Sequence, residues 1–175
     1  MLFIYGSLSV GGIETFFVRM AKERARLGLS TSMLLLSKPE SGNDELLTEA
    51  KKYARVMFSE EIFLFKPSIS SRLCLLAPIK KDNLTLLFKH VDQIHTFDGM
   101  HALFGLRLSK IVNRKIPITI GFYHYIKYLW GGDKVALHEK INRQFVFDYL
   151  PSESLLFFSK GSRDLYSKHQ KKNFD

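Results

Sequence analysis

Short apolar runs alternate with helix-length amphipathic segments along the chain, and this alternation restricts the fold more than any other feature. Strands are predicted at 2–5, 33–36, 55–58, 92–97, 118–123 and 155–158. The first run, Leu2 to Tyr5, is continuously apolar, which is typical of a strand covered on both faces. The pattern predicts one α/β domain over residues 1–175, a Rossmann-like parallel sheet with helices on both faces.

Helices are predicted between these strands. They are expected at about 13–27, 44–53, 69–77, 83–90 and 100–113, after Asp133, and from Lys160 onward. Gly28 stands where a C-cap glycine belongs, and Asp82 is expected to cap the helix at 83–90. Ligands of such sheets bind beyond the carboxyl ends of the strands. Function is therefore expected in the loops after the first, fourth, fifth and sixth strands.

Length and composition favour an ordinary globular domain. The chain has 175 residues and is 46% apolar, enough for a sizeable core. Cys74 is the only cysteine, which excludes an intrachain disulfide and a metal site built on several cysteines. No apolar run approaches the ~18 residues typical of a membrane span, and the N-terminus lacks a signal-peptide pattern. We expect a cytoplasmic protein.

The loop after the first strand contains Gly11 and Gly12, followed by Glu14 in the first turn of a helix. Two glycines allow a ligand to approach the backbone closely. The N–H groups and positive dipole end of the following helix favour an anion such as phosphate. The alternative is that the two glycines only form a tight strand-to-helix turn. Neither G-x-G-x-x-G nor a Walker A sequence occurs, which disfavours a dinucleotide or ATP site.

The start of the chain resembles the opening of family 4 retaining glycosyltransferases of the GT-B fold. The likeness lies in Gly11-Gly12-Ile13-Glu14, followed by Phe17, Ala21, Leu27 and Gly28. The likeness continues in Ile94-His95-Thr96-Phe97, Gly121-Phe122-Tyr123-His124 and Leu156-Phe157-Phe158-Ser159, which are similar to the strand ends of that family. These motifs occur in the family's order over nearly the whole chain.

The resemblance implies the N-terminal, acceptor-side domain of an enzyme that moves a sugar from a nucleotide-sugar donor to a glycan or lipid-linked acceptor with retention. Gly11, Gly12 and Glu14 would lie against the donor diphosphate or the acceptor. No cofactor is implied, and no metal is expected because Asp-x-Asp is absent. The family's donor domain, with its Arg/Lys pair and Glu-x7-Glu signature, is not in residues 1–175. We therefore expect a truncated or separate subunit, inactive alone.

His124 matches the histidine that ends the fifth strand in this family. The resemblance implies a catalytic position, where imidazole hydrogen-bonds a sugar hydroxyl or stabilises developing charge. The alternative is a loop histidine packed between Tyr123 and Tyr125. Tyr125 also stands where the family often has Asp or Thr, so the local geometry differs from the family pattern.

Asp98 and Ser159 each have a functional and a structural interpretation, whereas a structural one is favoured for His95 and His101. Asp98 could bind acceptor hydroxyls or cap the helix at Met100, and Ser159 could contribute to the same cleft or cap the last helix. His95 is expected to be a hydrogen-bonded core histidine. His101, in the first turn of a helix, is expected to be solvated.

The net charge of +9 favours anionic partners. The basic and apolar stretch from Phe63 to Lys81 could lie on an anionic membrane surface, or it could be a buried helix with solvated lysines. No nucleic-acid partner is expected, because no nucleic-acid-binding motif occurs. Two other functions stay open. One is a non-catalytic Rossmann-like module that binds an anionic ligand or partner, and the other is a membrane or nucleic-acid binder driven by charge.

Overall fold

The computed structural model describes residues 1–9, 11–39, 42, 44–64, 77–97, 99–122, 150, 154–157 and 159–170. Its strands are β1 (Leu2–Tyr5), β2 (Ser32–Leu35), β3 (Arg55–Phe58), β4 (Ile94–Thr96), β5 (Ile118–Phe122) and β6 (Leu155–Phe157). Its helices are α1 (Gly12–Arg26), α2 (Glu45–Ala50), α3 (Ser59–Ile62), α4 (Lys81–Phe88), α5 (Gly99–Ile111) and α7 (Lys160–Gln170).

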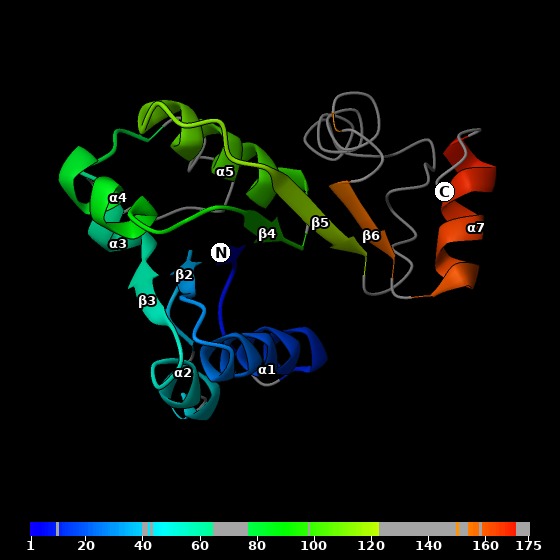
Figure 1. Cartoon of the computed structure of the whole chain (residues 1–175), viewed down its shortest axis with the longest axis horizontal. Helices are drawn as coiled ribbons and strands as arrows, with labels where there is room; N and C mark the ends of the chain where they lie inside the picture. The colour runs from blue at the N-terminus through cyan, green and yellow to red at the C-terminus, as the bar shows by residue number, and fades with distance from the viewer. Residues whose placement is uncertain are drawn as a thin grey trace.

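The six strands form one sheet in the order β3-β2-β1-β4-β5-β6, and every neighbouring pair is parallel (Figure 1). Phe3 pairs with Met33 on one side and with His95 on the other. The chain therefore starts in the middle of the sheet, builds outward to β3, and then crosses back to add β4, β5 and β6. This arrangement confirms the predicted α/β, Rossmann-like fold.

Helices cover both faces of the sheet, as Figure 1 shows with α1 and α2 on one side and α3, α4 and α5 on the other. One core cluster lies under α1 and α2 and includes Phe3, Phe17 and Met33. The other lies under α4 and α5 and includes Ile4, Phe88 and Phe104. Adjacent strand residues such as Phe3 and Ile4 point to opposite faces, so β1, β2 and β3 contribute to both clusters.

Most predicted elements are present, with shifted ends. Gly28 has a φ of +71°, which confirms the predicted C-cap glycine. The cap predicted for Asp82 is wrong, because α4 begins at Lys81 and its N-cap is Lys80. Asp82 instead lies in the first turn, where its charge favours the helix dipole.

Some elements differ from the sequence pattern. The helix predicted at 44–53 ends at Ala50, and the strand predicted at 92–97 covers only Ile94–Thr96. The four-residue helix α3 was not predicted, because its single turn is too short to produce a periodic pattern. The helices predicted at 69–77 and after Asp133 lie outside the described residues. Within the described part of the chain, no helix is both long and apolar enough to cross a bilayer.

Candidate functional site

The Gly-Gly loop lies at the carboxyl end of β1, where the sequence predicted a binding site. Gly11 is the N-cap of α1 in an extended conformation, and no side chain caps the helix there. The Thr15 hydroxyl and backbone N–H both donate to the Gly11 carbonyl oxygen, at 2.7 and 3.1 Å. Gly12 is exposed, and a Cβ added to it would meet nothing within 4 Å. A ligand therefore has open access to the backbone at Gly12.

The half-buried Glu14 side chain folds back over this loop. The Tyr5 hydroxyl donates a 3.1 Å hydrogen bond to Glu14 Oε1, and Glu14 Oε2 occupies the space where a Cβ on Gly11 would lie. The backbone of Gly11 is extended and open to any residue, so a larger residue here would only have to displace the flexible end of the Glu14 side chain. An anion approaching Gly11 would meet this carboxylate. The loop therefore presents an oxygen acceptor to ligands close to Gly11.

Two aromatic rings and a histidine lie around Tyr5, and the nearest is the Phe17 ring, whose centroid lies 5.1 Å from that of Tyr5. The Phe97 ring lies 5.8 Å from the Tyr5 ring, centroid to centroid, in an edge-to-face arrangement. The His101 ring lies 6.1 Å from the same ring and is buried, so the expectation that His101 is solvated is wrong. The first turn of α5 packs toward the carboxyl end of β1, which excludes water from His101.

The sequence contained a signal for the burial of His101. His101, Phe104, Gly105 and Leu108 follow one another at helical spacing, and all four are buried. This i, i+3, i+4, i+7 row predicts the core-facing side of a helix. His101 therefore packs next to Tyr5 at the candidate site, although it was not among the predicted site residues.

Ser159 caps α7, as one of its two interpretations predicted. Its hydroxyl oxygen accepts a 3.1 Å hydrogen bond from the Ser162 backbone N–H, and its carbonyl accepts one from the Arg163 N–H. Ser159 is exposed and follows the carboxyl end of β6. It thus lies at the same edge of the sheet as the Gly-Gly loop, although its hydroxyl already stabilises the helix end.

His124 and Asp98 lie outside the described residues, and the roles predicted for them stay predictions. Phe122, two residues before His124, is the last residue of β5, and Gly99, directly after Asp98, is the first residue of α5. Among the described residues, no three His, Cys, Asp or Glu side chains gather into a group that could hold a metal ion.

His95 is a core histidine on the α1 face of the sheet, as predicted. It is buried, and its Nδ1 lies 2.8 Å from the Thr119 hydroxyl oxygen on the adjacent strand. Burial lowers the pKa of His95 to about 4, so the ring is neutral at pH 7. The rings of Phe3 and Phe17 both pack edge-on against it, at 5.8 and 5.9 Å.

A groove of about 270 Å³ opens beside His95. It is lined by Met1, Phe3, Phe16, Met20, Gln93, His95, Thr119, Gly121 and Leu156. The lining residues come from β1, β4, β5, β6 and α1, except for Met1 and Gln93, which directly precede β1 and β4. The groove is mainly apolar and is separate from the Gly-Gly loop, because none of Gly11, Gly12 and Glu14 lines it.

Comparison with protein-family models, with curated proteins and with solved structures finds no match to this chain. The function is therefore inferred from the fold and from the residues at the carboxyl edge of the sheet.

Proposed function

We propose that this chain is the acceptor-side domain of a retaining glycosyltransferase, similar to family 4 enzymes of the GT-B fold. The enzyme would transfer a sugar from a nucleotide-sugar donor to a glycan or lipid-linked acceptor. The observation that supports this proposal most directly is the Glu14 carboxylate, which Tyr5 holds beside the open backbone of Gly12. Its position at the carboxyl edge of a parallel sheet is where such folds bind ligands.

The chemistry of this loop suits a sugar hydroxyl. An ionised carboxylate accepts hydrogen bonds only, and bonds from hydroxyls to charged acceptors are short and strong. Tyr5 donates to Oε1, and no described residue donates a hydrogen bond to Oε2. Glu14 would therefore bind an acceptor hydroxyl through Oε2, while Gly12 leaves space for the sugar ring.

The remaining predicted residues complete the proposal. His124 would face the reaction centre, Asp98 would bind further hydroxyls, and Ser159 would border the cleft at the end of β6. Binding and activating the donor would require a second domain. We further propose a cytoplasmic enzyme that associates peripherally with an anionic membrane, because a lipid-linked acceptor resides there.

The alternative, a non-catalytic module for an anionic ligand, gains less support from the loop. Glu14 Oε2 occupies the space next to Gly11 that an anion would need. Placing two negative charges within a few ångströms of each other is unfavourable, particularly at a partly buried site. The geometry thus favours a neutral, hydroxyl-rich ligand over phosphate at this point.

Saccharide binding tests the proposal directly. Saturation-transfer difference NMR on the chain would be recorded with a panel of neutral oligosaccharides and, separately, with inorganic phosphate. We expect saccharide signals that Glu14→Gln reduces at least about fivefold, since one hydrogen bond to a charged group is lost. Glu23→Gln, on the exposed end of the same helix, is the matched control and should keep the signals.

The same panel contains the results that would contradict the proposal. If no saccharide gives a signal, or if Glu14→Gln and Glu23→Gln bind equally well, the acceptor role of this loop is wrong. If phosphate binds at the loop and Glu14→Gln strengthens phosphate binding, the loop is an anion-binding site and not an acceptor site.

A further inference from the structure

Charge is distributed unevenly over the molecule. Residues 1–64, which include α1, α2 and α3, contain eight Lys or Arg and eight Asp or Glu residues. Residues 77–122, which include α4 and α5, contain seven Lys or Arg and only three Asp or Glu residues. The segment that contains α4 and α5 therefore has four more basic than acidic residues, while α3, on the same side of the sheet, contributes the carboxylates Glu60 and Glu61.

Arg114 connects the end of α5 to the end of α4 and so brings several of these basic residues onto one surface. Its Nη1 donates to the Phe88 carbonyl at 2.5 Å and its Nη2 to the Val91 carbonyl at 2.6 Å, which ties the end of α5 to the end of α4. Lys89 directly follows Phe88, and Lys115 directly follows Arg114. With Lys110 in the last turn of α5, these exposed residues form what we call the α4–α5 basic surface: Lys89, Lys110, Arg114 and Lys115.

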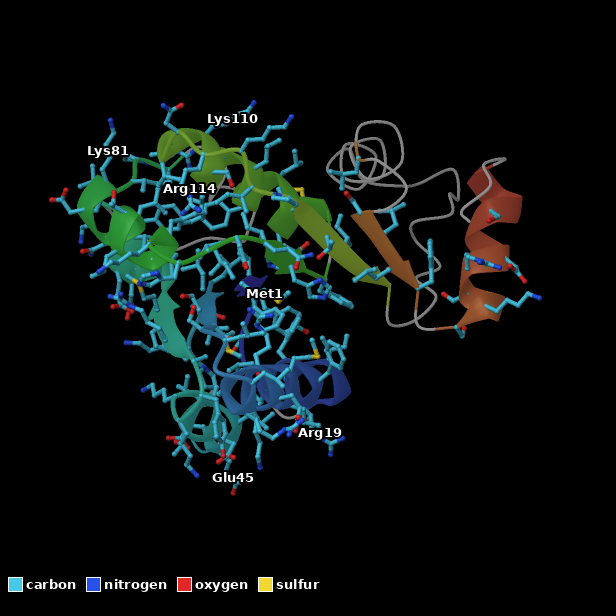
Figure 2. The ribbon with its side chains drawn as sticks, viewed as in Figure 1. Met1, Arg19, Glu45, Lys81, Lys110 and Arg114 are labelled. Carbon is cyan, nitrogen blue, oxygen red and sulfur yellow. The ribbon has the colours of Figure 1, made fainter. Side chains whose placement is uncertain are left out.

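Figure 2 places this surface relative to the rest of the molecule. Lys110 and Arg114 lie on the α4 and α5 side with Lys81, whereas Arg19 and Glu45 lie on the opposite side, over α1 and α2. The two sides are separated by the sheet, so cations on one side are distant from those on the other.

Carboxylates do not neutralise this surface. On the opposite half, Arg26 pairs with Glu23 and Lys52 with Glu49. Among the described residues, none of the four cations of the α4–α5 basic surface forms an ion pair, since Arg114 donates to uncharged carbonyls. Asp92, the acid that follows α4, already pairs with the N-terminal ammonium at 3.1 Å. The positive charge is therefore directed to solvent. The C-terminal ends of α4 and α5 carry partial negative charge, which stabilises the cations next to them and offsets only a fraction of their charge.

An exposed leucine accompanies the cations. Leu86, on α4, is 46% exposed, and Arg55 Nη1 donates to its carbonyl at 3.3 Å, which adds a fifth cation nearby. At the other end of α4, Leu64 is 54% exposed, and its N–H donates to the Pro78 carbonyl. Basic residues flanked by exposed aliphatic side chains suit a lipid interface. Surfaces for single-stranded nucleic acid instead use stacked aromatic rings, which none of these residues provides.

We propose that the α4–α5 basic surface docks on an anionic phospholipid membrane. Lys89, Lys110, Arg114 and Lys115 contact the headgroups, and Leu86 reaches the boundary of the acyl chains. Four to eight clustered cations are typical of segments that bind anionic lipid. The inference rests on the proposed function for its membrane location, but vesicle binding and saccharide binding are measured independently.

Sedimentation with lipid vesicles tests the inference. We expect the chain to bind vesicles made of equal parts phosphatidylcholine and phosphatidylserine, and to bind phosphatidylcholine vesicles at least about tenfold more weakly. Binding to the mixed vesicles should fall as salt is raised, because the Debye length shortens. Equal binding to both kinds of vesicle, or no binding to either, would overturn the inference.

Two matched triple variants test the surface itself. The first variant combines Lys89→Gln, Lys110→Gln and Lys115→Gln. It should weaken binding to the mixed vesicles by about 100-fold, because each cation contributes roughly fivefold to the affinity. The control variant removes the same charge from α1 and the end of α2, and it should weaken binding by less than about threefold; it combines Arg19→Gln, Lys22→Gln and Lys51→Gln. Leu86→Ser should weaken binding without changing its dependence on salt.

The results of these experiments distinguish a membrane surface from a nonspecific charge effect and from a nucleic-acid surface. Equal losses from the two triple variants would show that net charge alone drives binding and would reject a specific surface. Binding of duplex DNA that only the first triple variant abolishes, with no vesicle binding, would reject the membrane in favour of nucleic acid. All variants retain Arg114 and its two carbonyl contacts, so their circular dichroism spectra should match that of the parent chain.

Discussion

Tyr5 and Glu14 are joined by a 3.1 Å hydrogen bond between the phenol hydroxyl and Oε1, which links the end of β1 to the first turn of α1. The contact spans the Gly-Gly loop and holds the carboxylate over Gly11. Several consequences of this arrangement, and of the packing around it, can be measured.

Gly11 and Gly12 should respond oppositely to alanine. Gly11→Ala would place a Cβ against Glu14 Oε2 and displace the carboxylate from Tyr5, so we expect a loss of about 1 kcal/mol in the free energy of unfolding, the value of that hydrogen bond. Gly12→Ala meets open space within α1 and should be neutral or stabilising by up to about 1 kcal/mol. Urea unfolding of both variants measures the difference. Equal stabilities would show that Glu14 does not occupy this position.

The Tyr5–Glu14 bond should appear as a coupling energy. Tyr5→Phe removes the hydroxyl and should cost about 1 kcal/mol, because the bond is only partly buried. In a double-mutant cycle with Glu14→Ala, the coupling should be about 0.5–1.5 kcal/mol. Tyr53→Phe, at the end of the α2 region, serves as the control and should show no coupling to Glu14. A Tyr5 coupling near zero would mean that the hydroxyl does not hold the carboxylate.

His95 should make stability depend on pH below neutrality. Burial lowers its pKa to about 4, whereas the unfolded chain has a value near 6.5. Between these values the unfolded state binds more protons, so stability falls as pH decreases from about 6.5 to 4. The loss should approach about 3 kcal/mol below pH 4. His95→Gln, compared with the exposed control His90→Gln, should flatten this part of the profile in unfolding measured from pH 4 to 7. An unchanged slope would contradict the buried neutral ring.

Arg114 should stabilise the junction between α4 and α5 through its planar guanidinium. It donates to two carbonyls at 2.5 and 2.6 Å, a bidentate arrangement that one ammonium reproduces poorly. Arg114→Lys should therefore cost about 1–2 kcal/mol, mainly because a partly buried carbonyl loses its donor. Lys115→Gln, at the adjacent exposed position, should change the free energy of unfolding by less than about 0.5 kcal/mol. Similar effects at the two positions would assign Arg114 no structural role.

The sequence predicted much of the fold because strand and helix patterns are local. The order of strands and helices, the Gly-Gly loop at the end of β1 and the cap by Ser159 all follow from short-range periodicity and capping chemistry. The start of α4 was missed, since Lys80 as N-cap carries no side-chain signal. The buried state of His101 was also missed, although its helical row with Phe104 and Leu108 indicates it.

The sequence by itself determined that this is an α/β chain with covered parallel strands and a glycine loop at a carboxyl end. Only the tertiary structure decided that Glu14 fills the space beside Gly11 and that Arg114 joins two helix ends into an uncompensated basic surface. The physical reason is that periodicity records which face a residue takes within its own element. The contacts of a side chain with other elements depend on how those elements pack in space.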